Sequence, residues 1–359
     1  MCIRDSALCP ARTKEKGNVT TKKKYTRLAA LLAALLVALT ACGAQTDNTA
    51  VPASVSTGEP ITTALSTTIP TTAVSTTQTT TPVTTTTTAP PTTTTTVTTT
   101  TATSADGFQP GRIYSKYVLL YRVEDGEVIY EQAADKRMYP ASMTKMMTMW
   151  LAIRHLPLEQ EVTVSADIFP ALYEASKAGF QPGEVVTVKD LLYGAMLPSG
   201  GEAAVMLAVA LDGSEAAFAE RMNQEAQRIG MADTHFVNAT GLHDDNHYST
   251  ARDVLLLLRT VLQNETFREI FSTAEYTTSP TNLHPNGLHL RSTFLKHWNP
   301  ALLEDGKVYG GKTGFTDQAG RCLASAAEKH GLHYLLVTAG ADGSHHITDA
   351  QNIYGRYLP

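Results

Sequence analysis

The sequence predicts a mixed α/β domain of the α+β type, in which helices cover one antiparallel sheet and form a helical subdomain. Two observations carry this prediction. Residues 108–359 begin and end with strand patterns, and a long run of helical patterns lies between them. Strands that frame an inserted helical segment bury their apolar faces most simply in one sheet that the helices cover. A chain of about 250 residues is long enough for one substantial core.

The first two strands are expected to form a hairpin. Residues 117–123 and 128–130 are mostly apolar, and Asp125-Gly126 lies between them. An Asp-Gly pair between two apolar runs is a strong hairpin signal. The stretch 139–151 follows, and it has almost no polar face, which indicates a helix buried on most sides. Pro140 suits the beginning of that helix, because its missing N–H and fixed φ are tolerated in the first turn.

A helical region is predicted between residues 188 and 263. The pattern indicates helices over 189–196 and 202–211, interrupted by Leu-Pro-Ser-Gly-Gly. Ser214 is placed to cap a third helix, whose apolar residues recur with helical spacing. Thr250 and Asp253 have the spacing of a capping box at the start of a fourth helix.

The C-terminal part returns to strand patterns. A strand is predicted over 308–316, and residues 322–327 and 334–339 are apolar runs that form a hairpin around His330-Gly331. A final helix is expected from about 347 to 354.

Residues 1–42 have the pattern of a targeting segment. Basic residues at 22–27 precede an apolar run at 28–39, which is too short to span a membrane comfortably. The run ends in Leu-Thr-Ala-Cys, which resembles a bacterial lipobox, so Cys42 is the predicted lipidation site. The alternative is ordinary cleavage before an unmodified cysteine. The opening MCIRDS resembles translated adapter sequence, so we expect about the first 20 residues to be spurious and the true start to lie further in.

Residues 43–107 have a composition that cannot build a packed core. Fourteen of the twenty residues from 81 to 100 are threonine, and prolines interrupt them. Such a segment is expected to be disordered and fairly extended. We therefore predict a stalk, with threonines that are candidate O-glycosylation sites, which holds the following domain at a distance from the membrane.

The cysteine count and the charge narrow the class of protein further. Of the four cysteines, only Cys322 would remain unmodified after the predicted processing, so the domain is expected to contain no disulfide. The formal net charge of −5 gives no reason to expect a nucleic-acid partner.

Ser142 and Lys145 are the candidate nucleophile and base. They lie three residues apart at the start of the stretch 139–151, so the lysine amine can reach the serine hydroxyl. A serine needs a nearby base to attack a carbonyl, and a lysine buried among apolar neighbours loses its proton readily. Chance matches to S-x-x-K are common, so this pair alone is weak support.

Two later motifs strengthen the prediction. Ser199 lies in the loop between two predicted helices, and Lys312-Thr313-Gly314 lies on the strand predicted over 308–316. S-x-x-K, S-G-x and K-T-G occur in the order found in penicilloyl serine transferases. Gly314 would let a ligand lie close to the strand.

Each of these residues has an expected role. Ser142 attacks a carbonyl, Lys145 takes its proton, and the Ser199 hydroxyl passes a proton to the leaving amine. Lys312 and Thr313 are expected to hold the carboxylate of the substrate. This chemistry requires no cofactor and no metal.

With these motifs, the chain resembles the D-alanyl-D-alanine carboxypeptidases of the low-molecular-mass penicillin-binding protein type (serine peptidase family S11). The resemblance covers nearly all of residues 112–355. Besides the three motifs, the matching segments are 128–131, 183–193, 236–242, 247–253 and 319–323. The resemblance implies the β-lactamase/transpeptidase-like fold and removal of the terminal D-Ala from peptidoglycan stem peptides.

The resemblance has three further implications. It implies acylation by β-lactams, which act as inhibitors because they mimic D-Ala-D-Ala. It implies an oxyanion hole formed by the backbone N–H groups of Ser142 and Phe315. Together with Cys42, it implies a lipoprotein on the outer face of the bacterial cell membrane.

Two departures from the family pattern bear on function. The family's S-G-N motif is Ser199-Gly200-Gly201 in this chain, so the amide that helps to orient the lysine and bind the substrate is missing. We expect turnover to suffer more than acylation, with Glu202 or a water as candidate substitutes, and we expect Gly201→Asn to raise D-Ala release. The family's small second β-domain has no counterpart in the sequence, and the stalk is a candidate for its positioning role.

Two other functions remain as alternatives. A class A β-lactamase has the same fold, but it adds a glutamate in an E-x-x-L-N loop, and residues 234–238 read Thr-His-Phe-Val-Asn instead. A non-catalytic wall-binding or β-lactam-sensing module is favoured by Gly201, whereas Ser142, Lys145 and Lys312 argue against it. Covalent labelling without turnover would select that module.

A metal site is a further possibility to weigh. His243-Asp-Asp-Asn-His247 has residue types and spacing that metals use. The surrounding glycine and asparagine indicate a loop, and we expect these histidines to be structural or to line the substrate rim.

Overall fold

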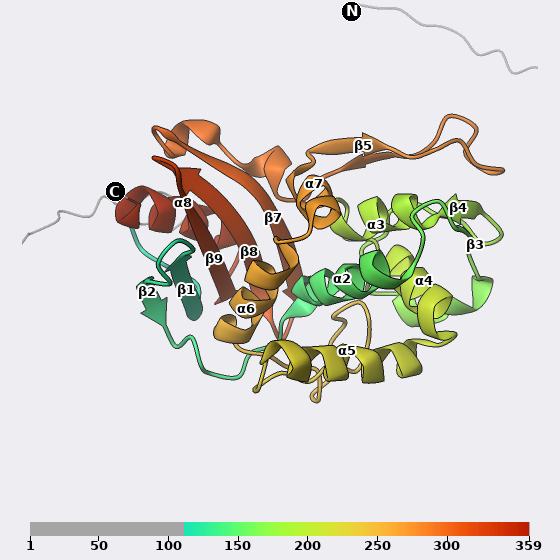
Figure 1. Cartoon of the computed structure of the whole chain (residues 1–359), viewed down its shortest axis with the longest axis horizontal. Helices are drawn as coiled ribbons and strands as arrows, with labels where there is room; N and C mark the ends of the chain where they lie inside the picture. Colours follow the sequence, from blue (N-terminus) through green and yellow to red (C-terminus); the bar gives the residue numbers. More distant parts are fainter. Residues whose placement is uncertain (1–110, 359) are drawn as a thin grey trace, which may run out of the picture. The chain divides into compact units, whose positions relative to one another are not determined.

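The computed structural model describes residues 111–358. The predicted targeting segment, Cys42 and the stalk lie outside the described residues. Within 111–358, no helix has the length and apolar character needed to cross a membrane. A five-stranded antiparallel sheet lies at one end of this part of the chain (Figure 1). Its strands are β1 (Tyr117–Arg122), β2 (Val128–Gln132), β7 (Gly306–Thr316), β8 (Gly320–Lys329) and β9 (Leu332–Ala341).

The strand order confirms the prediction that both ends of the domain contribute to one sheet. The order is β2-β1-β9-β8-β7, and every neighbouring pair is antiparallel. The N-terminal hairpin joins the C-terminal strands through β1 and β9, where Tyr117 is opposite Ala339. Strand β7, which carries the K-T-G motif, lies at the edge of the sheet, so one of its sides is left unpaired by strands.

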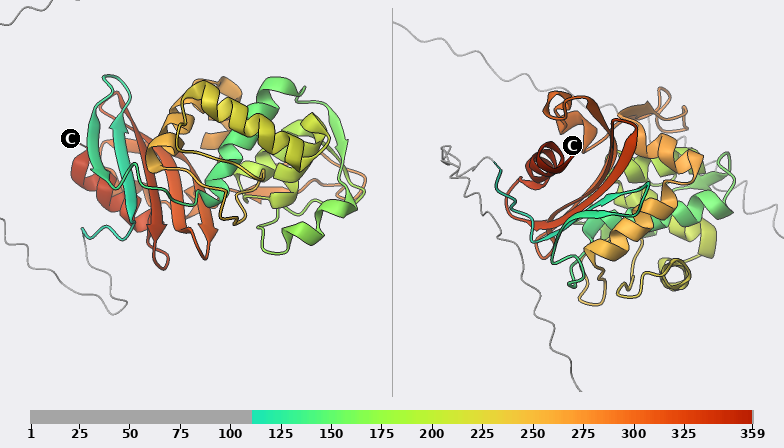
Figure 2. Two further views of the ribbon diagram at one scale, coloured as in Figure 1. Left: turned by 90° about the horizontal axis from the view of Figure 1, so that it is seen from below. Right: turned by 60° about the vertical axis from the view of Figure 1, so that its left-hand side comes forward.

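Both faces of the sheet are buried. In β9, Leu335 and Val337 belong to the large core on the helical side, whereas Tyr334 and Leu336 belong to a second core on the opposite face. This alternation follows from the two-residue period of a strand. Helix α8 (His346–Tyr357) covers the second face, as Figure 2 shows.

The remaining helices form the predicted helical subdomain around α2 (Lys145–His155). Helix α2 is buried along most of its length, as its lack of a polar face predicted. Its neighbours include α3, α4, α5, α6 and α7. Their bounds are α3 (Val188–Met196), α4 (Gly201–Asp212), α5 (Glu215–Ile229), α6 (Ala251–Val261) and α7 (Glu265–Ser272).

The two predicted helix caps have different outcomes. Ser214 Oγ accepts a hydrogen bond from Ala217 N at 3.2 Å and caps α5. Thr250 Oγ1 likewise accepts from Asp253 N at 3.0 Å. The Asp253 carboxylate, however, accepts from Asp233 N and Thr234 Oγ1 instead of completing the capping box. Asp253 therefore joins the start of α6 to the preceding loop.

Several short elements were not predicted from the sequence. Two are two-stranded sheets, formed by β3 (Glu161–Thr163) with β4 (Val185–Thr187) and by β5 (Glu275–Thr277) with β6 (His289–Arg291). The others are helix α7 and the 3₁₀ turns Ala141–Thr144, Ala166–Ile168, Pro170–Leu172, Leu295–His297 and Pro300–Leu302. A three-residue strand is too short to show the alternation that identifies strands in a sequence.

Candidate active site

The structure brings Ser142 and Lys145 into contact, as predicted. Ser142 lies in the 3₁₀ turn Ala141–Thr144, and Lys145 is the first residue of α2. Residues three apart align along a 3₁₀ turn, and Lys145 Nζ lies 3.0 Å from Ser142 Oγ. The same amine donates to the Thr240 carbonyl oxygen at 2.8 Å. The helix thus begins later than the sequence indicated, and the turn before it presents the serine.

The environment of Lys145 favours its neutral form. Its side chain is buried, and burial lowers the pKa of the amine to about 7, although the negative charges of Glu202 and Glu215 act in the opposite direction. A large fraction of Lys145 is therefore unprotonated near pH 7. A neutral amine 3.0 Å from a serine hydroxyl can accept its proton.

Ser199 and Lys312 form a second pair. Ser199 lies between α3 and α4 with a positive φ of 66°, and Lys312 lies on β7. Lys312 Nζ donates to Ser199 Oγ at 2.8 Å and to the Thr313 carbonyl oxygen at 2.8 Å. Lys312 is buried, and burial together with the charge of Lys145 lowers its pKa well below the usual value.

The edge strand β7 lies directly against the turn that carries Ser142. A Cβ atom added to Gly314 would lie 3.0 Å from both Ser142 N and Ala141 Cβ. A glycine at this position therefore lets the strand approach the serine closely. Phe315 follows on the same strand, so the proximity of β7 to Ser142 N supports the expected oxyanion hole, which stays a prediction.

The loop that supplies the Thr240 carbonyl was part of the family resemblance, but sequence reasoning assigned it no role. Asn238 Oδ1 accepts from Gly241 N at 2.7 Å and from Thr240 N at 3.1 Å, which closes a tight turn. Gly241 has φ +78°, and a Cβ atom on it would lie 1.8 Å from the Ala141 carbonyl oxygen. Asn followed three residues later by Gly is the local signal of this turn.

His247 has a structural role in the same region. It is buried, and burial lowers its pKa to about 3, so the ring is neutral. Val237 N donates to Nδ1 at 3.2 Å, so the ring proton is on Nε2, which lies 2.8 Å from Thr144 Oγ1. His247 thereby ties this loop to the turn that carries Ser142. His243 instead contacts the ring of Tyr139 edge-on.

The surroundings of Gly201 correct two expectations: that Gly201 belongs to the loop between two helices, and that Glu202 substitutes for the missing amide. Gly201 is the first residue of α4, not a loop residue, and the space beside it is filled, because a Cβ atom on it would lie 2.6 Å from Ala175 Cβ. The Glu202 carboxylate does not replace the missing amide. It accepts from Ala178 N at 2.6 Å and Gly179 N at 2.8 Å. Glu202 thus holds the segment 172–179 in place beside Gly201 through these two hydrogen bonds.

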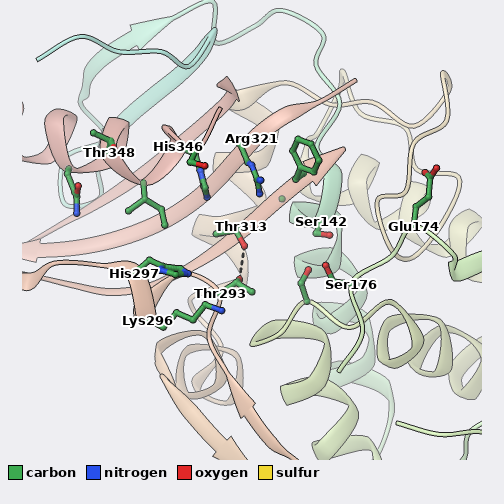
Figure 3. Close-up of a pocket in the computed structure, with 16 residues that line it drawn as sticks. Ser142, Glu174, Ser176, Thr293, Lys296, His297, Thr313, Arg321, His346 and Thr348 are labelled. Carbon is green, nitrogen blue, oxygen red and sulfur yellow. Dashed lines mark hydrogen bonds between the residues drawn. The ribbon is translucent and has the colours of Figure 1, made fainter. Parts of the chain in front are cut away.

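A pocket of about 640 Å³ opens at Ser142. Ser199, Thr313, Gly314 and Phe315 also line it, whereas Lys145, Lys312 and Gly201 do not. Figure 3 shows Ser142 between two groups of lining residues. Glu174 and Ser176 lie on one side, and on the other side are Thr293, Lys296, His297, Thr313, Arg321, His346 and Thr348.

A family model described as D-alanyl-D-alanine carboxypeptidase matches residues 99–343. The chain belongs to this family, peptidase S11. The D-alanyl-D-alanine carboxypeptidase DacF of Bacillus subtilis is 33% identical over 232 residues, which are 63% of this chain and 57% of DacF. This S11 chain therefore spans little more than half the length of that relative.

Solved structures of similar proteins show the same fold. The Streptomyces K15 DD-transpeptidase matches with a TM-score of 0.61 and 28% identity, covering 69% of this chain and 98% of that one. Penicillin-binding protein D2 of Listeria monocytogenes, in an ampicillin-bound form, matches with a TM-score of 0.56 and 28% identity over the same shares. The predicted β-lactamase/transpeptidase-like fold is therefore confirmed.

Proposed function

We propose that this chain is a serine-type D-alanyl-D-alanine carboxypeptidase that removes the terminal D-Ala from peptidoglycan stem pentapeptides. The observation that carries the proposal is the contact between Ser142 Oγ and a buried lysine amine, 3.0 Å away, whose pKa is about 7. The family match to D-alanyl-D-alanine carboxypeptidases supports the substrate class.

The geometry suits formation of an acyl-enzyme. Lys145 Nζ accepts the Ser142 proton while Oγ bonds to the carbonyl carbon of the penultimate D-Ala. The carbonyl oxygen gains negative charge beside the backbone N–H groups of Ser142 and Phe315. When the C–N bond breaks, the departing D-Ala amine takes a proton through the Ser199 hydroxyl, which Lys312 orients. Water then hydrolyses the ester and releases the shortened peptide.

The test combines turnover with labelling. We expect the wild type to release D-Ala from a pentapeptide and to be labelled by a fluorescent penicillin, which acylates the same serine. Ser142→Ala should abolish both, and Lys145→Ala should slow acylation by several orders of magnitude. Ser176→Ala is the matched control, because Ser176 lines the same pocket outside the three motifs. Labelling that persists in folded Ser142→Ala would refute the assignment of the nucleophile.

The same assays separate the alternatives. Rapid hydrolysis of penicillin without D-Ala release would select a β-lactamase. Stable labelling without any turnover would select a β-lactam-sensing or wall-binding module. Gly201 favours the non-catalytic module, whereas the contact between Ser142 Oγ and Lys145 Nζ favours the carboxypeptidase.

The proposed location is the outer face of the bacterial cell membrane, with Cys42 as the lipid-bearing residue. The support is the Leu-Thr-Ala-Cys sequence after an apolar run. A diacylglyceryl group supplies two chains, which suffice for stable attachment. Cys42→Ser should lose metabolic lipid labelling and move the protein out of the membrane fraction. A wild type that takes up no labelled fatty acid would rule out this anchor.

A further inference from the structure

Glu174 is the only carboxylate among the described residues that line the pocket at Ser142. Figure 3 shows it on the opposite side of Ser142 from Thr313. The side chain is exposed, and it forms no salt bridge within residues 111–358. The positively charged residues that line the pocket, Lys296 and Arg321, lie on the Thr313 side. Glu174 therefore presents a negative charge without a salt-bridge partner at one end of the pocket.

The segment that carries Glu174 is held on both sides of this residue. Before it, Leu172 is buried, and the Leu172 carbonyl oxygen accepts a hydrogen bond from Lys177 Nζ at 2.6 Å. After it, the Ser176 carbonyl oxygen accepts from Gly201 N at 2.7 Å. The amine of Lys177 is thereby engaged by the backbone of its own segment instead of pairing with Glu174. A carboxylate on a backbone that is already ordered loses less conformational freedom when it binds a ligand.

This segment can lie at the pocket because position 201 is a glycine. A Cβ atom on Gly201 would lie 2.6 Å from Ala175 Cβ. The Glu202 carboxylate also accepts hydrogen bonds from the N–H groups of residues 178 and 179. The family pattern has an asparagine at position 201, and its amide helps to bind the substrate. In this chain, the packing that the glycine permits places a carboxylate at the same pocket instead.

We propose that Glu174 selects peptides that carry an ammonium group on their acyl part, on the side chain of the residue before D-Ala-D-Ala. The K-T-G motif is expected to hold the carboxylate of the leaving D-Ala, so the acyl part extends away from Thr313 and toward Glu174. An ammonium group there gains a charge-assisted hydrogen bond to a carboxylate that has no salt bridge of its own. A neutral side chain gains no such bond, and an acidic one is repelled. This inference rests on the proposed carboxypeptidase function for its substrate.

The test compares two pentapeptides that end in D-Ala-D-Ala and differ only at the third residue, which is lysine in one and Nε-acetyllysine in the other. We would measure kcat/KM for D-Ala release from each and form the amine-to-acetyl ratio. Acetylation also adds atoms, so this ratio is compared between variants. Glu174→Gln should lower the ratio about two- to fivefold, the size expected for an exposed ion pair. Glu174→Lys should lower it further, because the new cation repels the amine.

Two controls separate recognition of charge from other effects. Glu220→Gln removes one negative charge from an exposed position on α5, outside the pocket, and it should leave the amine-to-acetyl ratio at the wild-type value. Added salt should reduce the wild-type ratio, because an exposed ion pair is screened. An equal loss on both peptides in Glu174→Gln would assign Glu174 to the shape of the segment. A ratio that is the same in the wild type and Glu174→Gln, or that falls equally in Glu220→Gln, would also overturn the inference.

A second readout keeps this inference distinct from the proposed function. Acylation rates would be measured with a penicillin whose acyl side chain ends in a primary amine and with its N-acetyl derivative. If the wild type is acylated but releases no D-Ala, the carboxypeptidase proposal fails, and the amine-to-acetyl ratio of the acylation rates still tests Glu174. That ratio should fall in Glu174→Gln and fall further in Glu174→Lys. Equal ratios in the wild type and both variants would refute the selection of a cationic acyl group by Glu174.

Discussion

Gly201 and Ala175 lie so close together that a Cβ atom on Gly201 would be 2.6 Å from the Cβ of Ala175. Gly201 N also donates to the Ser176 carbonyl oxygen at 2.7 Å. The segment 172–179 therefore occupies the space that a longer side chain at position 201 would need. Glu202 holds this segment through the N–H groups of residues 178 and 179. One wall of the site is thus built around the glycine.

Gly201→Asn should consequently not raise activity by itself, contrary to the expectation from the motif alone. Overpacking typically costs about 1–3 kcal/mol, so we expect a lower melting temperature and displacement of the pocket residue Ser176. Adding Ala175→Gly should recover stability and allow any benefit of the amide to appear in kcat/KM for D-Ala release. A stable single variant with raised kcat/KM would show that the segment 172–179 moves aside easily.

Acylation should depend on pH through Lys145. The amine accepts the Ser142 proton only when it is neutral, and its pKa is about 7. The rate of penicillin acylation should therefore rise with pH through about 7 and level off above it. Stopped-flow labelling measures this profile at a series of pH values from about 5.5 to about 8.5, a range that extends about one pH unit or more on each side of the Lys145 pKa. A rate that does not change across this range would argue against Lys145 as the base.

Glu202→Gln should shift that profile in a defined direction. The negative charge of Glu202 raises the pKa of Lys145, so its removal should lower that pKa and move the rising limb to lower pH. Glu220→Gln is the control, because Glu220 is an exposed residue of α5. A shift to higher pH in Glu202→Gln would contradict the electrostatic role given to Glu202.

Gly241→Ala should damage both stability and acylation. The added methyl group would meet the Ala141 carbonyl oxygen at 1.8 Å, next to Ser142. Gly213→Ala is a matched control, because Gly213 has a similar φ of +74° and no atom within 4 Å of the added Cβ. We expect about 1–2 kcal/mol of destabilisation and normal labelling for the control. Equal thermal melts and labelling rates for the two variants would exclude a steric role for Gly241.

Asn238 should matter for catalysis although it does not line the pocket. Its Oδ1 atom closes the turn that presents the Thr240 carbonyl oxygen to Lys145 Nζ. Asn238→Ala leaves those N–H groups unpaired, and we expect slower acylation with about 1–3 kcal/mol lower stability. Asn238→Asp retains an acceptor and should restore much of both. If Asn238→Ala acylates at the wild-type rate, the Thr240 contact is not needed to orient Lys145.

Much of the fold and of the candidate site followed from local patterns in the sequence. The Asp125-Gly126 turn, the cap at Ser214 and the apolar strands near the C-terminus depend on neighbouring residues, and all three were predicted correctly. The i, i+3 spacing likewise predicted the contact between Ser142 and Lys145. Such features are set within a few residues, so the sequence alone determined them.

Other features arise only where distant segments meet. The Thr240 carbonyl reaches Lys145 across 95 positions, Ala175 fills the space beside Gly201, and Arg321 reaches the pocket wall from β8. The short strands β3 to β6 also form only through pairing with strands outside their own local pattern. Tertiary structure decided these features, because volume, burial and hydrogen-bond partners at each position depend on residues that no local pattern identifies.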